Sequence, residues 1–232
     1  MNTPETPNKY QEGQVLLIDK PLEWTSFDVV KKVRGTLRIK KVGHAGTLDP
    51  LATGLLIVCT GKMTKQIERF QGAEKEYTGT LVLGKTTPSL DLETDFDSDV
   101  PTDHLTPEDV ERVRESFLGT QQQIPPHYSA IKVDGKRAYK SAHKGKEVKM
   151  EPRIVEITEL EFTRIAIPEV DFRVVCSKGT YIRSLARDIG EAVGVGAHLS
   201  ALCRTRIGDQ LLANAQPLPD LITQIKEEYA SS

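Results

Sequence analysis

The spacing of apolar residues divides the chain into a series of short strands and amphipathic helices. An apolar run at 15–19, VLLID, predicts a buried strand, and Thr25 or Ser26 is a suitable N-cap for a helix after it. Helical spacing over 27–37 places Phe27, Val30 and Val33 on the inner face. By the same reasoning, further strands are predicted at 55–60, 74–84, 154–165 and 169–177, and helices at 107–119, 181–194 and 220–229.

The segments between these elements are rich in glycine and proline. We expect 43–54, GHAGTLDPLATG, to be a loop and 120–152 to be an exposed basic excursion. Residues 1–14 are polar and are expected to form a flexible N-terminal segment. Because there is no repeat and no interdomain linker, 15–232 is predicted to be one domain.

Composition limits the class of protein. The hydrophobic fraction is 38% and the charged fraction 28%, which is typical of a folded globular protein. No signal peptide or membrane-spanning run is evident, so we expect a cytoplasmic protein. Cys59, Cys176 and Cys203 are odd in number and lie in apolar surroundings, which favours buried free thiols over disulfides or a metal site.

The formal net charge is −2, but the charged residues are distributed unevenly along the chain. Six basic and no acidic residues lie between Lys31 and Lys41, and seven basic residues stand against two acidic ones in 132–149. Ten carboxylates are concentrated between Asp91 and Glu115. Such segregation permits a basic, phosphate-binding face, although solvated surface charge explains it equally well.

Three other patterns resemble functional motifs. Residues 79–86, GTLVLGKT, match the spacing of a phosphate-binding loop and suggest a nucleotide hydrolase, but the motif falls on a predicted strand and Pro88 prevents the required helix. Asp95, Asp97 and Asp99 are spaced like the start of a calcium loop that lacks its glycine and final glutamate. The histidines have no ligand spacing, so no metal is predicted.

An Asp-Pro pair at Asp49 is ordinary turn chemistry on its own. Its surroundings, however, match in order the motifs of a known enzyme family, and the chain resembles the TruB-type tRNA pseudouridine synthases from Leu16 to about Gly208. The matching segments are LLIDKP, GHAGTLDPLATGLL, KEYTGTLVLGKTT, IPPHYSAIKVDGKRAY, GTYIRSLARDIG and GAHLSALCRTRIG. Members usually continue into a C-terminal RNA-binding domain, and the 24 residues after Gly208 are too few for one, so a short form is expected.

The resemblance implies an α+β pseudouridine synthase fold with a central mixed, mainly antiparallel sheet. It also implies isomerisation of uridine 55 in the T loop of tRNA to pseudouridine, without a cofactor. Asp49 is implied as the catalytic carboxylate, with Arg183 as its charge partner and Tyr77 as the aromatic against which the extruded base stacks. These three side chains are expected to converge on one cleft.

The resemblance extends to the substrate-binding residues. Tyr181 and Leu202 are implied to line the base pocket, His44 to contact the RNA, and Lys20 to belong to the pocket. Lys132, with the rest of the basic excursion, and the 31–41 cluster are expected to hold phosphates of the T loop and elbow. His143 stands where an arginine is expected. We expect a monomer with no obligate protein partner, and the alternative function is a non-catalytic tRNA-binding module or RNA chaperone.

Overall fold

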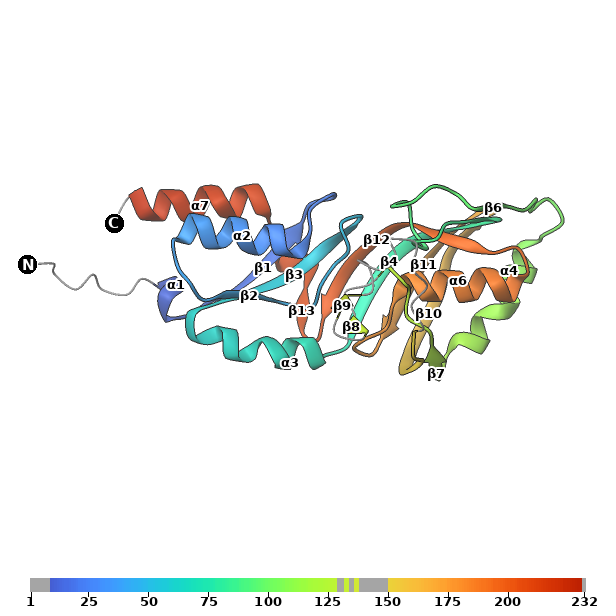
Figure 1. The fold of residues 1–232 in the computed structure, drawn as a ribbon, viewed down its shortest axis with the longest axis horizontal. Coiled ribbons are helices and arrows are strands. Elements are labelled where there is room, and N and C mark those ends of the chain that lie inside the picture. Colours follow the sequence, from blue (N-terminus) through green and yellow to red (C-terminus); the bar gives the residue numbers. More distant parts are fainter. Residues whose placement is uncertain (1–8, 129–131, 134–135, 138–149, 231–232) are drawn as a thin grey trace, which may run out of the picture. The chain divides into compact units, whose positions relative to one another are not determined.

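The computed structural model describes residues 9–128, 132–133, 136–137 and 150–230, which fold into two compact units. The first unit contains the chain up to Glu76 and from Cys203 onward, and the second contains Tyr77–Leu202. The chain passes between them within strands β4 (Lys75–Leu83) and β12 (Ala197–Ile207), which are labelled in Figure 1. Each unit is described by itself.

The first unit is a small sheet with helices on both faces. Strand β1 (Val15–Lys20) pairs antiparallel with β3 (Ala52–Thr60), and Ile18 lies opposite Leu56. Strand β2 (Val42–Ala45) also pairs antiparallel with β3, whereas β14 (Gln216–Pro217) pairs parallel with β1. The remaining elements are α1 (Lys9–Glu12), α2 (Ser26–Leu37), η1 (Gly61–Gln66), α3 (Ile67–Gly72), β13 (Gln210–Leu211), η3 (Leu212–Asn214) and α7 (Leu218–Ala230).

Alternate residues of β3 belong to two different hydrophobic clusters. Leu56 and Val58 pack with the buried faces of α2 and α7, while Leu55, Ile57 and Cys59 pack with residues of η1 and α3. Figure 1 shows α2 and α7 on one side of β1 and β3 and α3 on the other. This explains why the sequence LLIVC is apolar at every position, since a strand covered on both faces has no solvent-facing side.

Helix α2 begins with a capping box. Thr25 accepts a hydrogen bond from the Asp28 amide, and the Asp28 carboxylate accepts one from the Thr25 amide in return. The predicted inner face is correct for Val30 and Val33 and wrong for Phe27, whose side chain is 63% exposed. Phe27 lies in the first turn, where the cap directs it away from the sheet, and Val29 is buried instead.

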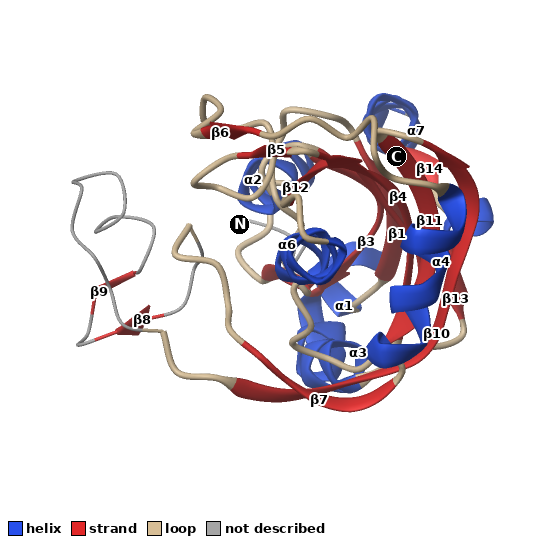
Figure 2. Cartoon of the chain, turned by 90° about the vertical axis from the view of Figure 1, so that its right-hand side faces the viewer, coloured by secondary structure: helices blue, strands red, loops and turns tan. Residues whose placement is uncertain are grey.

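The second unit is built on the antiparallel strands β10 (Arg153–Ala166) and β11 (Glu169–Cys176). Strand β7 (Gly119–Gln123) pairs antiparallel with β10 on its other side. Helix α6 (Ile182–Val193) lies within the curve formed by β11, β10 and β7 in Figure 2. The remaining elements are β5 (Lys85–Thr86), β6 (Ser98–Asp99), α4 (Pro107–Arg114), η2 (Glu115–Phe117), β8 (Lys132–Val133) and β9 (Lys136–Arg137).

The predicted fold class is confirmed: the protein is α+β, and its mixed pairing is mainly antiparallel. The nucleotide-hydrolase motif at 79–86 is strand β4 followed by the short strand β5, as predicted, and not a loop that leads into a helix. Among the described residues, no helix is both long and apolar enough to cross a membrane.

The structure differs from the predictions at three segments. Residues 9–12 form α1, whose Tyr10 is buried and donates a hydrogen bond to Glu228 of α7, in place of a flexible segment. Strand β2 takes up the start of the predicted 43–54 loop and β3 its end, which leaves residues 46–51 between them. The excursion predicted at 120–152 overlaps β7. Its first four residues, 120–123, therefore belong to the sheet.

Gly54 occupies a position that only glycine tolerates. Its φ is 95°, and a Cβ there would lie 2.4 Å from the Arg204 carbonyl oxygen. We expect Gly54→Ala to lower the free energy of unfolding by more than about 2 kcal/mol in urea denaturation. Gly35→Ala is the matched control, because a Cβ at Gly35 meets no atom within 4 Å, and it should stabilise α2 by about 0.5–1 kcal/mol. Equal effects of both substitutions would contradict this interpretation.

Candidate active site

The Asp49 loop, residues 46–51, is tied to the start of α2 by a buried serine. The Leu48 amide donates to Ser26 Oγ at 2.8 Å, and Ser26 Oγ donates to the Leu48 carbonyl oxygen at 3.2 Å. Leu48 itself is 4% exposed and anchors the loop in the first unit. The Ala52 amide donates to the Asp49 carbonyl oxygen at 3.1 Å. Asp49 follows the anchored residue and is partly exposed.

A fully buried ammonium group lies under the same loop. Lys20 Nζ donates to the carbonyl oxygens of Pro21 at 2.9 Å, Trp24 at 2.5 Å and Pro50 at 3.2 Å. These bonds use all three ammonium protons. Burial lowers the pKa of Lys20 to about 8, and the negative charge of Asp49 is the largest influence that opposes this shift. Lys20 therefore joins the Asp49 loop electrostatically and through the backbone of Pro50, and its place in the base pocket stays a prediction.

A buried arginine ties the start of the loop to strand β3. Arg204 is 1% exposed, and its guanidinium donates to the Leu55 carbonyl oxygen at 2.8 Å and to that of Gly46 at 3.1 Å. Gly46 has a φ of 92°, which turns its carbonyl out of the β2 ladder. The sequence analysis did not single out Arg204. The segment 197–207 contains two arginines, Arg204 and Arg206, and spacing alone does not tell which of them is buried.

His44, on β2, is partly buried next to this arginine. Burial lowers the pKa of its imidazole; a hydrogen bond with the Gly46 backbone opposes the shift, and the charge of Arg204 adds to it. The Nδ1 atom of His44 is buried and has no hydrogen-bond partner among the described residues. The first unit thus brings together three of the predicted site residues, Lys20, His44 and Asp49.

In the second unit, Arg183 is held at the start of α6. Its side chain is 4% exposed, and its guanidinium donates to the carbonyl oxygens of Ser89 at 3.0 Å and Tyr128 at 2.9 Å. The same group lies 3.5 Å from the Asp91 carboxylate, which is 6% exposed. Asp91 begins the acidic stretch 91–115, and its carboxylate is one half of a buried ion pair.

Tyr181 lies two residues before Arg183 and is fixed by its backbone. The Tyr181 amide donates to Gln123 Oε1 at 2.8 Å, and Gln123 Nε2 donates to the Tyr181 carbonyl oxygen at 3.1 Å. The guanidinium carbon of Arg153 lies 5.3 Å from the centre of the Tyr181 ring, a cation–π distance. Gln123 and Arg153 were not predicted from the sequence, because their partners are distant along the chain.

The remaining predicted residues also belong to the second unit. Tyr77 on β4 is 8% exposed, and Leu202 on β12 is partly buried. The backbone of Lys132 pairs with that of Arg137 in the β8–β9 hairpin. His143 and the rest of 129–131, 134–135 and 138–149 in the basic excursion lie outside the described residues. Convergence of Asp49 with Tyr77 and Arg183 involves both units and stays a prediction.

Comparison with known proteins identifies the family. A profile described as the TruB family pseudouridylate synthase N-terminal domain matches residues 34–182, which is more than half of the chain. The chain belongs to the TruB family. A second profile, described as the tRNA pseudouridylate synthase B C-terminal domain, matches residues 183–231. The segment after Gly208, which the sequence analysis considered too short for an RNA-binding domain, thus lies within a family segment.

Relatives in this family match over nearly their full lengths. A protein of Flavobacterium johnsoniae named tRNA pseudouridine synthase B is 56% identical, over 90% of this chain and 95% of that protein. One of the same name from Opitutus terrae is 44% identical, over 97% of both chains.

Solved structures extend the likeness to the fold. A chain in a Cbf5–Nop10–Gar1 complex has a TM-score of 0.69 at 31% identity, and a chain in an H/ACA RNP bound to a substrate RNA has 0.68 at 29%. Both matches cover 92% of this TruB-family chain but only 54% and 53% of those chains, so the chain spans about half of their length.

Removal of one member of the buried Arg183–Asp91 pair leaves a charge without its counter-ion. We expect Asp91→Ala to lower the free energy of unfolding by about 3 kcal/mol, since an uncompensated buried charge is strongly destabilising. Asp95→Ala, in the exposed part of the same loop, is the control and should change it by less than about 0.5 kcal/mol. Similar losses for both variants in urea unfolding would show that the pair does not stabilise the second unit.

The lowered pKa of Lys20 predicts how the free energy of unfolding depends on pH. Between its folded-state pKa of about 8 and its ordinary value of 10.5, the unfolded chain keeps a proton that the folded chain has released. The free energy of unfolding of the wild type should therefore rise relative to that of Lys20→Met as the pH increases from 8 toward 10. Urea unfolding of both proteins over this range measures the difference. If the free energies of unfolding of the two proteins changed in parallel with pH, the lowered pKa of Lys20 would be contradicted.

Proposed function

We propose that this chain isomerises a uridine of tRNA to pseudouridine, with position 55 of the T loop as its target. Membership of the TruB family supports this, as does the identity of 44–58% to proteins named tRNA pseudouridine synthase B. The single observation that carries the proposal at the level of residues is the Asp49 loop, a carboxylate-bearing loop whose backbone is held by the buried donors of Lys20, Ser26 and Arg204.

The reaction needs one well-positioned carboxylate. The N1–C1′ glycosidic bond breaks, the uracil rotates, and C5 bonds to C1′. C5 then loses its proton while the freed N1 gains one, so atoms balance without an added reactant. Asp49 acts either as a nucleophile, at the sugar carbon or at the base, or as the base that starts a glycal route. All three routes require an ionised acid, and the nearby charge of Lys20 favours the ionised form.

The residues of the second unit take the remaining roles. Arg183 is the proposed charge partner of Asp49, and its bonds to Ser89, Tyr128 and Asp91 hold the guanidinium in a fixed orientation. Tyr77 is proposed to stack on the extruded uracil, with Tyr181 and Leu202 lining the pocket.

RNA contacts and cellular context complete the proposal. His44 contacts the RNA at the flipped site, and Lys132 holds a phosphate of the T loop or elbow. The enzyme works in the cytoplasm as a monomer, without a metal, nucleotide or organic cofactor.

Asp49→Asn tests the proposal, because it keeps the shape of the side chain and removes its charge. With a tRNA transcript carrying tritium at C5 of its uridines, we expect the rate of tritium release to fall by about a thousandfold or more, while tRNA affinity changes only a few-fold. Asp209→Asn, an exposed aspartate of the same unit, is the control and should release tritium at the wild-type rate.

Two outcomes would overturn the assignment. Substantial turnover by Asp49→Asn would exclude the catalytic role of this carboxylate. A wild-type protein that binds tRNA and releases no tritium would be a binding module or RNA chaperone.

A further inference from the structure

The surface beside the Asp49 loop carries an unusual concentration of exposed apolar side chains. Leu22, Trp24 and Phe27 are 54%, 37% and 63% exposed, and they lie within six residues of one another. Trp24 lines a groove of about 600 Å³ on the outer side of α2. The lining residues of this Trp24 groove are Glu23, Trp24, Asp28, Lys31, Lys32, Gly35 and Thr36.

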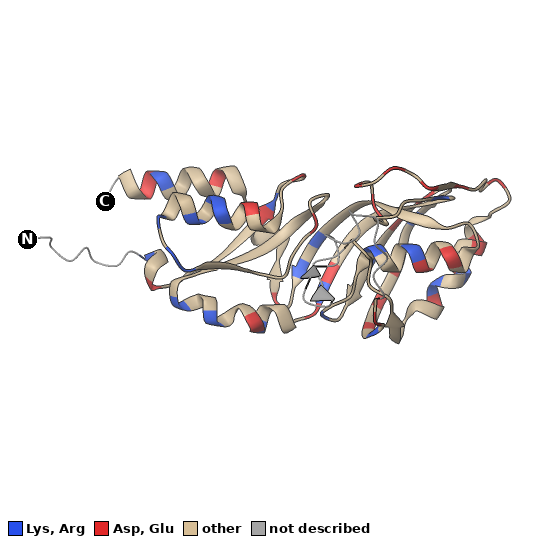
Figure 3. Ribbon diagram, in the orientation of Figure 1, with Lys and Arg blue, Asp and Glu red and all other residues tan. Residues whose placement is uncertain are grey.

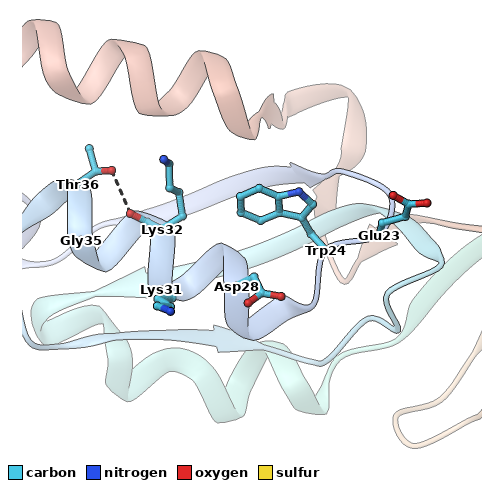
Figure 4. Close-up of a pocket in the computed structure, with 7 residues that line it drawn as sticks. All are labelled: Glu23, Trp24, Asp28, Lys31, Lys32, Gly35 and Thr36. Carbon is cyan, nitrogen blue, oxygen red and sulfur yellow. Dashed lines mark hydrogen bonds between the residues drawn. The ribbon is translucent and has the colours of Figure 1, made fainter.

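The chemistry of the Trp24 groove is aromatic and cationic. Figure 4 shows the Trp24 indole between Glu23 and Lys32. Lys31 and Lys32 are exposed, and Figure 3 shows that basic residues continue along α2 and into the segment after it. One of the two acidic residues, Asp28, has its carboxylate engaged in the capping box with Thr25. An aromatic face next to exposed ammonium groups suits a nucleobase joined to phosphates.

The Trp24 groove is linked directly to the Asp49 loop. The Trp24 carbonyl oxygen accepts a hydrogen bond from Lys20 Nζ, which also donates to the Pro50 carbonyl oxygen. The Glu23 amide donates to the same Pro50 oxygen at 2.9 Å. A strand of RNA whose uridine lies at Asp49 therefore has this groove as a neighbour on the same unit.

Gly35 gives an independent indication of a ligand. It lies inside a 12-residue helix, where glycine is less favourable than alanine. Apart from its chain neighbours and the backbone of the same helix, no atom of the described residues lies within 4 Å of a Cβ built at this position. Packing within the protein thus gives no reason for glycine at position 35. A ligand that passes close to the helix backbone does give one.

We propose that the Trp24 groove binds the tRNA substrate outside the catalytic pocket, with one unpaired nucleobase stacked on Trp24 and the adjoining phosphates on Lys31 and Lys32. This inference rests on the proposed function for the identity of the RNA. It assigns to Trp24, Lys31 and Lys32 a role in substrate affinity and not in the chemical step.

Trp24 is the only tryptophan of the chain, so its fluorescence reports on the groove directly. An unmodified tRNA transcript is titrated into full-length Asp49→Asn protein, which prevents turnover. We expect saturable quenching of Trp24 fluorescence, with a Kd equal to that from filter binding. Trp24→Leu, followed by filter binding, should weaken the affinity by about tenfold or more.

The charge and shape of the groove are tested by two further variants. Lys31→Ala with Lys32→Ala should weaken binding about tenfold and reduce the slope of log affinity against log salt concentration by about 1 to 2. The matched control, Lys62→Ala with Lys65→Ala, removes two exposed lysines of η1 and should have a much smaller effect. Gly35→Gln should weaken binding although its melting temperature equals or exceeds that of the wild type, which separates a blocked groove from a damaged fold.

Tritium release by otherwise wild-type protein separates this inference from the proposed function. If the groove variants raise KM and leave kcat near the wild-type value, the inference holds. The inference would be overturned, and the function left intact, by three results together: normal tritium release, no quenching of Trp24 fluorescence in Asp49→Asn protein, and unchanged affinity in all three groove variants. The groove would then bind a protein partner or no ligand. Absent tritium release with groove-dependent binding would overturn the function alone.

Discussion

Buried cations that donate to backbone carbonyls hold the candidate active-site loop in place. Lys20 and Arg204 are both almost completely inaccessible to solvent, and between them they bind carbonyl oxygens at Gly46, Pro50 and Leu55. Because a buried ammonium or guanidinium group is costly without full hydrogen bonding, these two residues stabilise one arrangement of the loop over any other. A carboxylate that must meet a reacting sugar or base within a fraction of an ångström needs such support.

The rest of the first unit supplies the rigid frame for these cations. Lys20 ends β1 and Arg204 lies on β12, while β3, which starts directly after the loop, is buried on both faces by α2 and α7 on one side and α3 on the other. In the second unit, Arg183 is held in the same manner, by two carbonyl oxygens and the Asp91 carboxylate. Both units therefore use backbone acceptors to orient charged groups that the proposed reaction needs.

Local patterns predicted the elements that form through local interactions. The strands around 15–19 and 169–177 and the helices around 27–37 and 181–194 follow from apolar spacing and caps, and the structure has them within a few residues. Phe27 was misplaced because the capping box, and not hydrophobicity, sets the direction of the first turn. Strand β2 was missed because its glycine and histidine are weak strand formers that pairing with β3 stabilises.

The site was predictable only in part, for a similar reason. Asp49, Lys20 and His44 were singled out through family motifs, which carry information about three-dimensional contacts that spacing alone lacks. Arg204, Asp91 and Gln123 were not predicted, because each acts through a partner 58 or more residues away. Asp91 shows the limit most clearly: an aspartate in an acidic stretch is ordinarily solvated, and only its burial against Arg183 distinguishes it.

Hydrogen exchange at the backbone amides of Leu48 and Ala52 tests most directly whether buried donors hold the Asp49 loop. These amides donate to Ser26 Oγ and to the Asp49 carbonyl oxygen. The account predicts that both exchange as slowly as the amides of β3 in the wild type, and at least about tenfold faster in Lys20→Met. Exchange at the rate of an open loop in the wild type, or no acceleration in Lys20→Met, would contradict it.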